Sequence, residues 1–340
     1  MIDFSNFIDL PLVWGVLIAT AVFLYALLDG FDLGCGILFP FAPSDKSRNQ
    51  IMNSIAPFWD GNETWLVLGT GGLFVAFPVA YAILLPAVYM PATFMLFGLI
   101  FRGVAFEFRF KASQKNRRMW DFSFHAGSLL AAFMQGMILG NVVQGFEVAG
   151  RNFAGGALDW ANGFAVLTGL GVVAAYALLG AAWLVYKTEG ATQKWARKMG
   201  RYVFFYVGLA MVVISISMPF MDSRIESLWF NTPNIYYLSI IPLLTLLAFY
   251  TLWKDLGDNK REVRPFLLVA AIFLLGYMGI CISLYPWIVP FEFTLWEAAA
   301  VSTSQSFVLI GTVIMLPIIL AYTAYCYYVF KGKSSDEPMY

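Results

Sequence analysis

Nine long apolar segments run through this chain and restrict it to very few folds. They lie near residues 11–40, 55–75, 78–101, 122–145, 160–186, 203–220, 235–253, 266–288 and 306–330. A helix of about 20 apolar residues crosses the hydrocarbon core of a bilayer. Because lipid cannot hydrogen-bond backbone N–H and C=O groups, the crossing segments must be helical. The sequence therefore predicts an all-α integral membrane protein with nine transmembrane helices, in which residues 1–340 form a single polytopic membrane domain.

The composition agrees with a chain that uses the membrane as its solvent. Hydrophobic residues make up 60% of the chain and charged residues 12%, whereas soluble domains have about half and a quarter. The N-terminal "MIDFSNFIDL" is acidic and lacks the positive region of a signal peptide. We therefore expect the first apolar segment to be retained as a helix. The net charge is zero, so no basic surface suggests nucleic acid as a partner.

The distribution of Lys and Arg orients the predicted helices. Of the 21 basic residues, only Arg151 and Arg224 fall in one set of alternate loops, and the other 19 fall in the other set. Basic residues collect in the cytoplasmic loops of membrane proteins. The N-terminus is therefore predicted to lie outside and the C-terminus in the cytoplasm, with the protein in the bacterial cytoplasmic (inner) membrane.

Acidic residues interrupt the first two apolar segments. Asp29 and Asp32 lie in "LLDGFDLGCG" (27–36), and Asp60 and Glu63 lie in "NSIAPFWDGNETW" (53–65). Each pair is spaced i,i+3, which predicts that its members share a helix face. With the orientation above, both pairs lie in the cytoplasmic half of the membrane.

The third apolar segment ends in the same half with Arg102 and, beyond it, Glu107. A charge at bilayer depth costs about 2.5–3.5 kcal/mol, so we expect these groups to have a role. Carboxyl groups that face each other favour holding a proton. The sequence thus indicates a proton path from the cytoplasm through Asp60, Glu107, Asp29, Asp32 and Glu63. The alternative is structural, with Arg102 clamping Asp29 or Asp32.

The residues offer no ligand set for a redox centre. His125 is the only histidine and follows a basic loop, and the three cysteines are isolated in apolar runs. Haem iron usually takes His, Met or Cys ligands, and the Met residues are scattered as in helix cores. No metal site and no catalytic residue is therefore predicted in this chain. On these grounds alone, a subunit of a respiratory complex, a proton-coupled secondary transporter and a purely structural membrane partner all remain open.

A series of motifs resembles one family along nearly the whole chain. They are, in order, "DGFDLG" (29–34), "MNSIAPFWDGNETW" (52–65), "FRGVAFEFR" (101–109), "NRRMWD" (116–121), "GNVVQG" (140–145), "SLYPWIVP" (283–290) and "PIILAYTAYCYYVF" (317–330). Together they resemble subunit II of the cytochrome bd-type quinol oxidases.

This resemblance implies a fold of nine helices, arranged as two four-helix bundles plus one peripheral helix. It implies a complex that oxidises quinol and reduces oxygen to water in the respiratory chain. The partner would be subunit I, in a heterodimer accompanied by small single-helix subunits and membrane lipid. Haems b and d and the quinol site would belong to subunit I, so this chain would be haem-free.

The resemblance also suggests roles for single residues. Asp60 resembles a position proposed to line a proton route along the subunit interface, and Glu107 stands where other members carry Asp. Trp65 matches a position that lines an apolar oxygen route towards haem d. Arg102 matches the Arg at the foot of the family's third helix.

Overall fold

The computed structural model describes residue 4 and residues 7–337. Eight of the helices within this part of the chain are long and apolar enough to cross a membrane. They are Leu10–Phe41, Tyr89–Arg109, Lys115–Gln144, Gly163–Lys187, Gly190–Phe220, Asn234–Gly257, Arg264–Leu284 and Ser302–Val329. The chain is therefore an all-helical, multi-pass membrane protein.

The first half of the chain forms six helices joined by short turns. They are α1 (Leu10–Leu38), α2 (Asp45–Ile55), α3 (Trp59–Ala76), α4 (Pro78–Ala87), α5 (Tyr89–Arg109) and α6 (Gln114–Gln144), with a 3₁₀ turn at Phe39–Phe41. Phe77 and Val88 interrupt the helical stretch around α4, next to Pro78 and Pro86. Because proline cannot donate a backbone hydrogen bond, the chain bends at these points.

The second half contains five long helices and several short elements. These are β1 (Val148–Ala149), β2 (Asn152–Phe153), α7 (Gly163–Lys187), α8 (Gly190–Ser217), a 3₁₀ turn at Met218–Phe220, α9 (Ser223–Phe230), α10 (Asn234–Leu238), α11 (Ile240–Gly257), α12 (Arg264–Leu284), β3 (Trp287–Val289), β4 (Phe293–Thr294), α13 (Leu295–Ala298) and α14 (Ser302–Val329). The strands form two small antiparallel pairs, β1 with β2 and β3 with β4.

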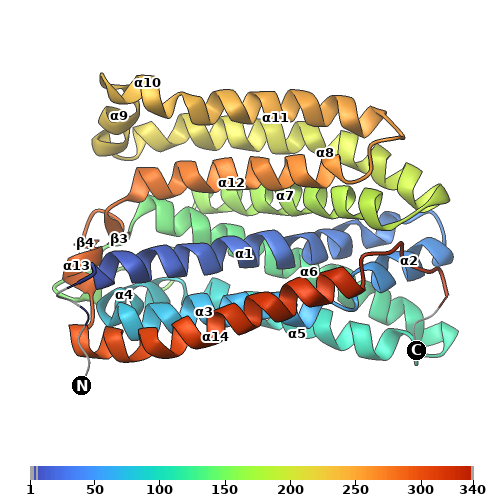
Figure 1. Cartoon of the computed structure of the whole chain (residues 1–340), viewed down its shortest axis with the longest axis horizontal. Helices are drawn as coiled ribbons and strands as arrows, with labels where there is room; N and C mark the ends of the chain where they lie inside the picture. Colours follow the sequence, from blue (N-terminus) through green and yellow to red (C-terminus); the bar gives the residue numbers. More distant parts are fainter. Residues whose placement is uncertain (1–3, 5–6, 338–340) are drawn as a thin grey trace.

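The long helices run side by side along the long axis of the molecule and form a layer that is more than one helix deep (Figure 1). Helix α1 contacts α3, α6 and α7; α5 packs on α6; α8 packs on α7; and α11 packs on α12. Glycine permits the closest of these contacts. A Cβ atom on Gly34 of α1 would lie 1.9 Å from the backbone oxygen of Tyr176 on α7, and one on Gly180 of α7 would lie 2.4 Å from the backbone of Gly34. Small residues allow membrane helices to approach in this way.

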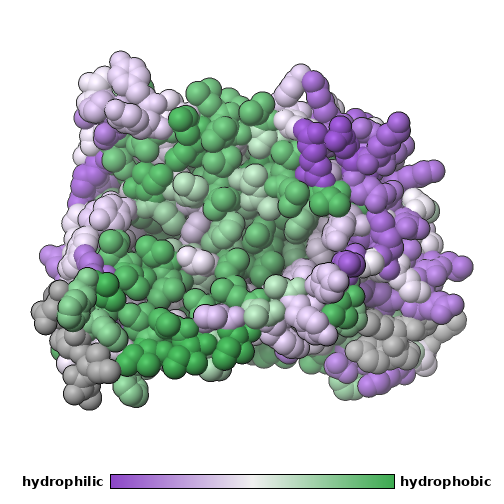
Figure 2. Space-filling model, viewed as in Figure 1, coloured by the Kyte–Doolittle hydropathy of each residue, from purple (hydrophilic) through white to green (hydrophobic). Residues whose placement is uncertain are grey.

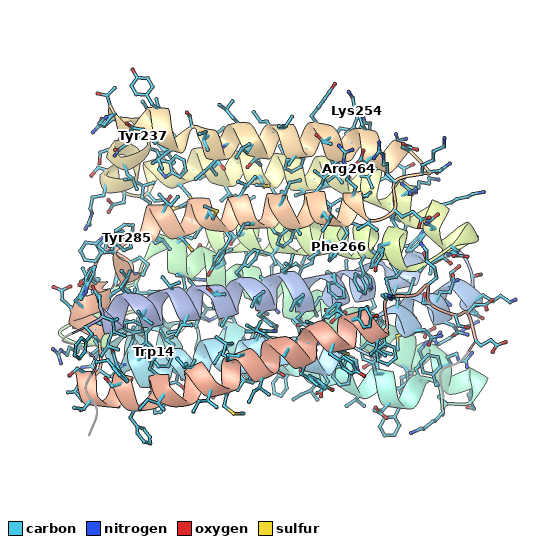
Figure 3. All side chains as sticks on the ribbon, in the orientation of Figure 1. Trp14, Tyr237, Lys254, Arg264, Phe266 and Tyr285 are labelled. Carbon is cyan, nitrogen blue, oxygen red and sulfur yellow. The ribbon has the colours of Figure 1, made fainter. Side chains whose placement is uncertain are left out.

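The two ends of the layer differ in polarity. Figure 2 shows an apolar band between two more polar ends, with the strongest hydrophilic surface at one of them. We call this the basic end; it comprises residues 42–58, 107–120, 186–201, 254–265 and 330–337. Residues 330–337 connect α7 and α2 at this end. Lys187 of α7 donates to the backbone oxygen of Gly332 at 2.7 Å, and Asn53 of α2 donates to that of Ser335 at 2.9 Å. Lys254 and Arg264 lie at this end in Figure 3, and Tyr237 and Tyr285 at the opposite end.

Every predicted apolar segment corresponds to a helix of the structure. Among the described residues, however, the number of helices that are long and apolar enough to cross is eight, whereas nine crossings were predicted. The segment 55–75 became α3, which starts with polar residues and is not among the eight apolar spans. The segment 78–101 became α4 together with most of α5. None of the predicted segments corresponds to α2, a separate helix at the basic end that consists mainly of polar residues.

Candidate functional site

A buried ion cluster lies where α1, α3 and α5 meet. Arg102 of α5 is fully buried. Its Nη1 donates to Oδ1 of Asp29 on α1 at 2.6 Å, and its Nη2 donates to Oε1 of Glu63 on α3. Asp29 is also fully buried, whereas 28% of the Glu63 side chain is exposed. One guanidinium group therefore links three helices, and of the two aspartates expected as partners of Arg102, Asp29 is the one that it contacts.

The second carboxyl group of α1 has a neutral partner. Asn62 of α3 donates from Nδ2 to Oδ2 of Asp32 at 2.7 Å and also to the backbone oxygen of Leu28 at 3.2 Å. The Tyr327 hydroxyl of α14 donates to Oδ1 of Asn62 at 3.1 Å. Among the residues that the structure describes, Asp32 makes no ion pair with a Lys or Arg side chain. The amide of Asn62 therefore connects this carboxyl group to α14.

A line of hydroxyl and amide groups continues from the cluster into α6 and α7. Tyr25 lies one helical turn before Asp29 on α1 and interacts with its carboxylate. Gln135 of α6 donates from Nε2 to the Tyr25 hydroxyl, and its Oε1 accepts from the Tyr176 hydroxyl of α7, both at 2.7 Å. The polar groups thus extend from Glu63 to Tyr176 through the interior of the first seven helices.

The burial of these groups follows from the packing of α1. Its residues from Asp29 to Leu38 are buried on every side, so both carboxyl groups point into protein and not into lipid. Asp29 lies nine residues before Leu38, or about 14 Å at 1.5 Å per residue. Arg102 lies seven residues before the end of α5 and Glu63 four after the start of α3, or about 10 Å and about 6 Å. The cluster therefore occupies the half of the layer next to the basic end.

The charges in the cluster do not balance. Three carboxyl groups, those of Asp29, Asp32 and Glu63, surround the single guanidinium of Arg102. Oδ2 of Asp29 and Oδ1 of Asp32 are buried and lack a hydrogen-bond partner, and leaving such an atom unsatisfied costs about 1–3 kcal/mol. A proton on one of these carboxyl groups would remove the cost of a buried negative charge that has no cation of its own, so the arrangement is suited to binding and releasing protons.

An apolar cavity borders the polar cluster. It has a volume of about 100 Å³ and lies between α1, α3 and α14. Trp65 forms part of its wall and is 3% exposed, and Tyr25 packs with Trp65 in the same apolar cluster. The remaining lining residues are Trp14, Leu17, Ile18, Thr20, Ala21, Leu24, Leu68, Thr312, Leu316 and Leu320. The cavity is partly open to the surface of the chain, where Thr20 and Leu320 are exposed, and its apolar wall suits a small apolar molecule.

Two of the predicted acids lie outside the cluster. Asp60 is exposed although it begins the same helix as Glu63. The Glu107 side chain is 60% exposed, and its Oε2 lies 3.9 Å from Nζ of Lys111, just beyond the end of α5. The expected convergence of five acids therefore holds for Asp29, Asp32 and Glu63 only.

The residues around the single histidine do not fit a haem. His125 of α6 is half-buried, and its Nδ1 lies 3.1 Å from the backbone oxygen of Gly36 on α1. A Cβ atom on Gly36 would lie 2.0 Å from Oγ of Ser128, so α1 and α6 are in direct contact there and leave no room for a macrocycle. The part of the chain that the structure describes also contains no group of three or more His, Cys, Asp or Glu residues that could hold a metal ion.

Sequence reasoning overlooked several members of the site. These are Tyr25, Asn62, Gln135, Tyr176 and Tyr327, all of which take part in the buried hydrogen bonds. Asn62 stands inside the quoted "WDGNETW" motif, and Gln135 is an isolated amide within an apolar segment. Polar side chains inside membrane helices are rare and costly, and this signal could have identified both.

Comparison with known proteins places the chain among respiratory oxidase subunits. A family described as "Cytochrome bd terminal oxidase subunit II" matches residues 10–330. The "Cytochrome bd ubiquinol oxidase subunit 2" of Bacillus subtilis (strain 168) is 30% identical, over 96% of this chain and 97% of that protein. The "Cytochrome bd-I ubiquinol oxidase subunit 2" of Escherichia coli (strain K12) is 28% identical, over 99% and 97%. A chain of the bd oxidase structure from Geobacillus thermodenitrificans has the same fold, with a TM-score of 0.74, 17% identity, and coverage of 95% of this chain and 99% of that one.

Proposed function

Because this chain belongs to the family of cytochrome bd terminal oxidase subunit II, we propose that it works as the haem-free subunit of a quinol oxidase and lines routes for protons and oxygen. As a subunit of this oxidase it takes part in quinol oxidation and oxygen reduction only within the complex. The rival reading as a proton-coupled transporter loses its support, since the relatives named above are oxidase subunits.

The proposed architecture has nine crossings. In it, α3 is the ninth crossing, and α4 with α5 forms one kinked crossing. The helices then divide into one group of α1, α3, α4–α5 and α6, and a second group of α7, α8, α11 and α12, with α14 as the peripheral helix. The packing contacts support this division, since α14 contacts mainly α3 and α1, whereas α7, α8, α11 and α12 contact one another. An odd number of crossings also agrees with the start of α1 and the end of α14 at opposite ends of the layer (Figure 1).

The proposed orientation puts the basic end in the cytoplasm. Lys and Arg are enriched on the cytoplasmic side of membrane proteins, and the basic end contains most of the 21 basic residues of the chain. The N-terminus would then lie outside. The buried cluster would lie in the cytoplasmic half of the membrane, where protons that are consumed in oxygen reduction would enter.

We assign haems b and d and the quinol site to the partner, subunit I, in a heterodimer that small single-helix subunits and lipid accompany. The support from this chain is chemical: its only histidine sits in a tight contact between α1 and α6 and does not fit an axial ligand. When bound in the complex, the haems supply the electron transfer to oxygen. The residues of this chain act on protons and on the access of oxygen.

The observation that carries the proton proposal is the excess of carboxyl groups around Arg102. With Asp29 and Glu63 bound to the guanidinium and Asp32 bound only to Asn62, a proton can be exchanged without leaving a guanidinium unpaired. Glu63 is the partly exposed member and would be the point of entry from the surface. The exposed Asp60, one turn earlier, and Glu107 would lie on the way to Glu63 along the face that subunit I covers.

The cavity beside Trp65 supports a separate route for oxygen. Oxygen is apolar and partitions into lipid, so it can enter a dry cavity between membrane helices, whereas a proton needs polar groups. Trp14 and Trp65 with aliphatic side chains form most of the cavity wall. Reduction of one oxygen molecule to water consumes four protons and four electrons. If quinol releases its protons at the outer face and the consumed protons enter from inside, the reaction separates charge across the membrane.

The proton proposal is tested in the purified heterodimer with Asp32→Asn, which keeps the shape of the side chain but cannot carry a proton. We expect quinol-dependent oxygen consumption to fall while the haem absorption spectrum stays unchanged. Glu226→Gln is the matched control, because it removes an exposed carboxylate of α9 at the opposite end. Unchanged turnover in Asp32→Asn would exclude this residue from the route. A heterodimer without oxidase activity in the unmodified form would refute the proposed function itself.

A further inference from the structure

The exposed face of α8 changes its chemistry in a fixed order along the helix. At the basic end it presents Lys194, Lys198 and Arg201. The next turn presents aromatic side chains, and the turns after that present aliphatic ones. In chain order these exposed residues are Tyr202, Phe205, Tyr206, Leu209, Val212 and Ile216.

The exposed face of helix α11 shows the same order from the basic end, although its chain runs in the opposite direction. Its exposed face presents Leu243 and Leu247, then Tyr250 and Trp253, and then Lys254 at the basic end. Figure 3 shows Lys254 on the outer side of the layer at that end. Because α8 and α11 are antiparallel neighbours, their cationic, aromatic and aliphatic zones lie at matching depths.

Ring contacts join the two faces into one surface. The rings of Phe205 and Trp253 are 5.1 Å apart, and the Arg201 guanidinium lies 5.0 Å from the Trp253 ring centre. A Cβ atom on Gly257 would lie 2.4 Å from the Arg201 guanidinium, so the absence of a side chain at the end of α11 makes room for this cation. Lys254 lies 4.2 Å from the Tyr250 ring centre.

The cations of this surface lack acidic partners. Helix α8 contains four basic residues and no acid. Among the described residues, Lys194, Lys198, Arg201 and Lys254 make no ion pair, whereas the basic residues of the following turn do. Those pairs are Arg261 with Asp258 at 3.7 Å and Arg264 with Asp255 at 3.0 Å. The surface therefore has uncompensated positive charge directly above a ring of aromatic side chains.

We propose that Lys198, Arg201 and Lys254 bind the phosphate headgroup of an anionic phospholipid, whose acyl chains lie along the aliphatic faces of α8 and α11. The order of cation, aromatic ring and aliphatic side chain matches the order of headgroup, interface and hydrocarbon in one leaflet. Clusters of Lys and Arg beside membrane helices recognise anionic headgroups. We refer to Lys198, Arg201 and Lys254 as the headgroup site.

A lipid fits this surface better than a protein helix does. Transmembrane helices that pack together use small residues at their contacts, but the exposed side chains named above are large. At the basic end the exposed charged residues of the two faces, Lys194, Lys198, Arg201 and Lys254, are all positive, which is complementary to a phosphate diester.

The test uses the purified oxidase complex after delipidation in detergent, with native mass spectrometry as the measurement. The probes are dioleoyl phosphatidylglycerol, dioleoyl phosphatidylcholine and glycerol 3-phosphate. We expect the unmodified complex to bind phosphatidylglycerol at least about ten times more tightly than phosphatidylcholine, because only phosphatidylglycerol has a net negative charge that the basic residues attract. Glycerol 3-phosphate should not compete, because it lacks the acyl chains. Its competition at equal concentration would show a site for free phosphate and overturn the lipid assignment.

The variant Lys198→Gln/Arg201→Gln/Lys254→Gln should bind phosphatidylglycerol about 100-fold more weakly, since each basic residue near an anionic lipid contributes about fivefold. The control Lys46→Gln/Lys115→Gln/Lys260→Gln removes the same charge from exposed positions at the same end and should keep the affinity of the unmodified complex. If the triple variant does not assemble, Lys254→Gln alone should still weaken binding about fivefold. Equal phosphatidylglycerol binding in the variant and the unmodified complex, or an equal loss in the control, would overturn the proposal.

Discussion

Replacing Arg102 by Gln tests whether the ion cluster is as dry as its burial indicates. The substitution leaves the fully buried Asp29 without its cation and frees the partly exposed Glu63. Removing one partner of a buried ion pair costs about 3–5 kcal/mol, because an uncompensated charge stays behind. The released Glu63 can turn to solvent and adds less. We therefore expect Arg102→Gln to lower the free energy of unfolding by about 4 kcal/mol.

The opposite partner gives a smaller expected loss. In Asp29→Asn the guanidinium keeps Glu63, so the cluster loses one charge-assisted hydrogen bond, worth about 1.5–3 kcal/mol. Arg118→Gln is the surface control, because Arg118 is exposed on α6 and such changes stay within about 0.5 kcal/mol. The expected order of destabilisation is thus Arg102→Gln, then Asp29→Asn, then Arg118→Gln.

The assay is unfolding of the purified complex in mixed micelles with rising SDS content, followed by the near-UV signal and compared at one common SDS fraction. A loss in Arg102→Gln no larger than that in Arg118→Gln would refute the reasoning. The cluster would then be well hydrated, with solvent replacing the guanidinium at little cost. Such a result would remove the structural role of Arg102 and leave the proton route as the better explanation of the three carboxyl groups.

Three further outcomes are expected. Asp60→Asn should lower quinol-dependent turnover with the haem spectrum intact if Asp60 leads protons to Glu63; normal turnover would remove it from the route. Trp65→Phe should change the dependence of the rate on oxygen concentration by enlarging the cavity, and an unchanged apparent oxygen affinity would contradict a channel there. At the basic end, hydrogen bonds from Lys333 and then Gln193 lower the pKa of Glu262. Glu262 therefore stabilises the protein fully at neutral pH, and this stabilisation is lost as the pH falls below about 4.3, the pKa of a free Glu, towards the lower pKa of the folded protein. The variant Glu262→Gln should lose this part of the pH dependence of the melting temperature. An identical pH profile in the variant and the unmodified protein would contradict the prediction.

Helical periodicity explains why the sequence could not predict which acids are buried in the cluster. Successive residues on an α-helix are rotated by about 100°, so Asp60 and Glu63 are about 60° apart. A surface boundary runs between them, with Asp60 exposed and Glu63 half-buried. Glu107 is five residues from Arg102 and so about 140° away around α5. An i,i+3 spacing predicts proximity but not which side of the pair the protein covers.

The remaining polar partners could not be derived from spacing. Asn62 meets Tyr327 across 265 positions of the chain, and Gln135 meets Tyr25 across 110. Such contacts depend on how the helices are arranged around α1, which hydrophobic patterning does not determine because lipid-facing and protein-facing residues are both apolar. The helices themselves were predictable, since length and apolar content alone define a crossing. Helices that are short or polar, such as α2, α9 and α13, are not found by that criterion.

Helix α3 borders two environments that suit different molecules. Its Asn62 and Glu63 contact the carboxyl groups and Arg102, and within the same turn Trp65 forms part of the wall of the apolar cavity. The polar groups among the lining side chains are two threonine hydroxyls and two indole N–H groups. These are too few hydrogen-bond partners to hold a chain of water molecules in the cavity. A proton would therefore stay with the polar groups, while an apolar gas would prefer the cavity. If both routes run through this subunit, a single turn of α3 keeps them apart, and variants of Trp65 should alter oxygen dependence without altering the effect of Asp32→Asn.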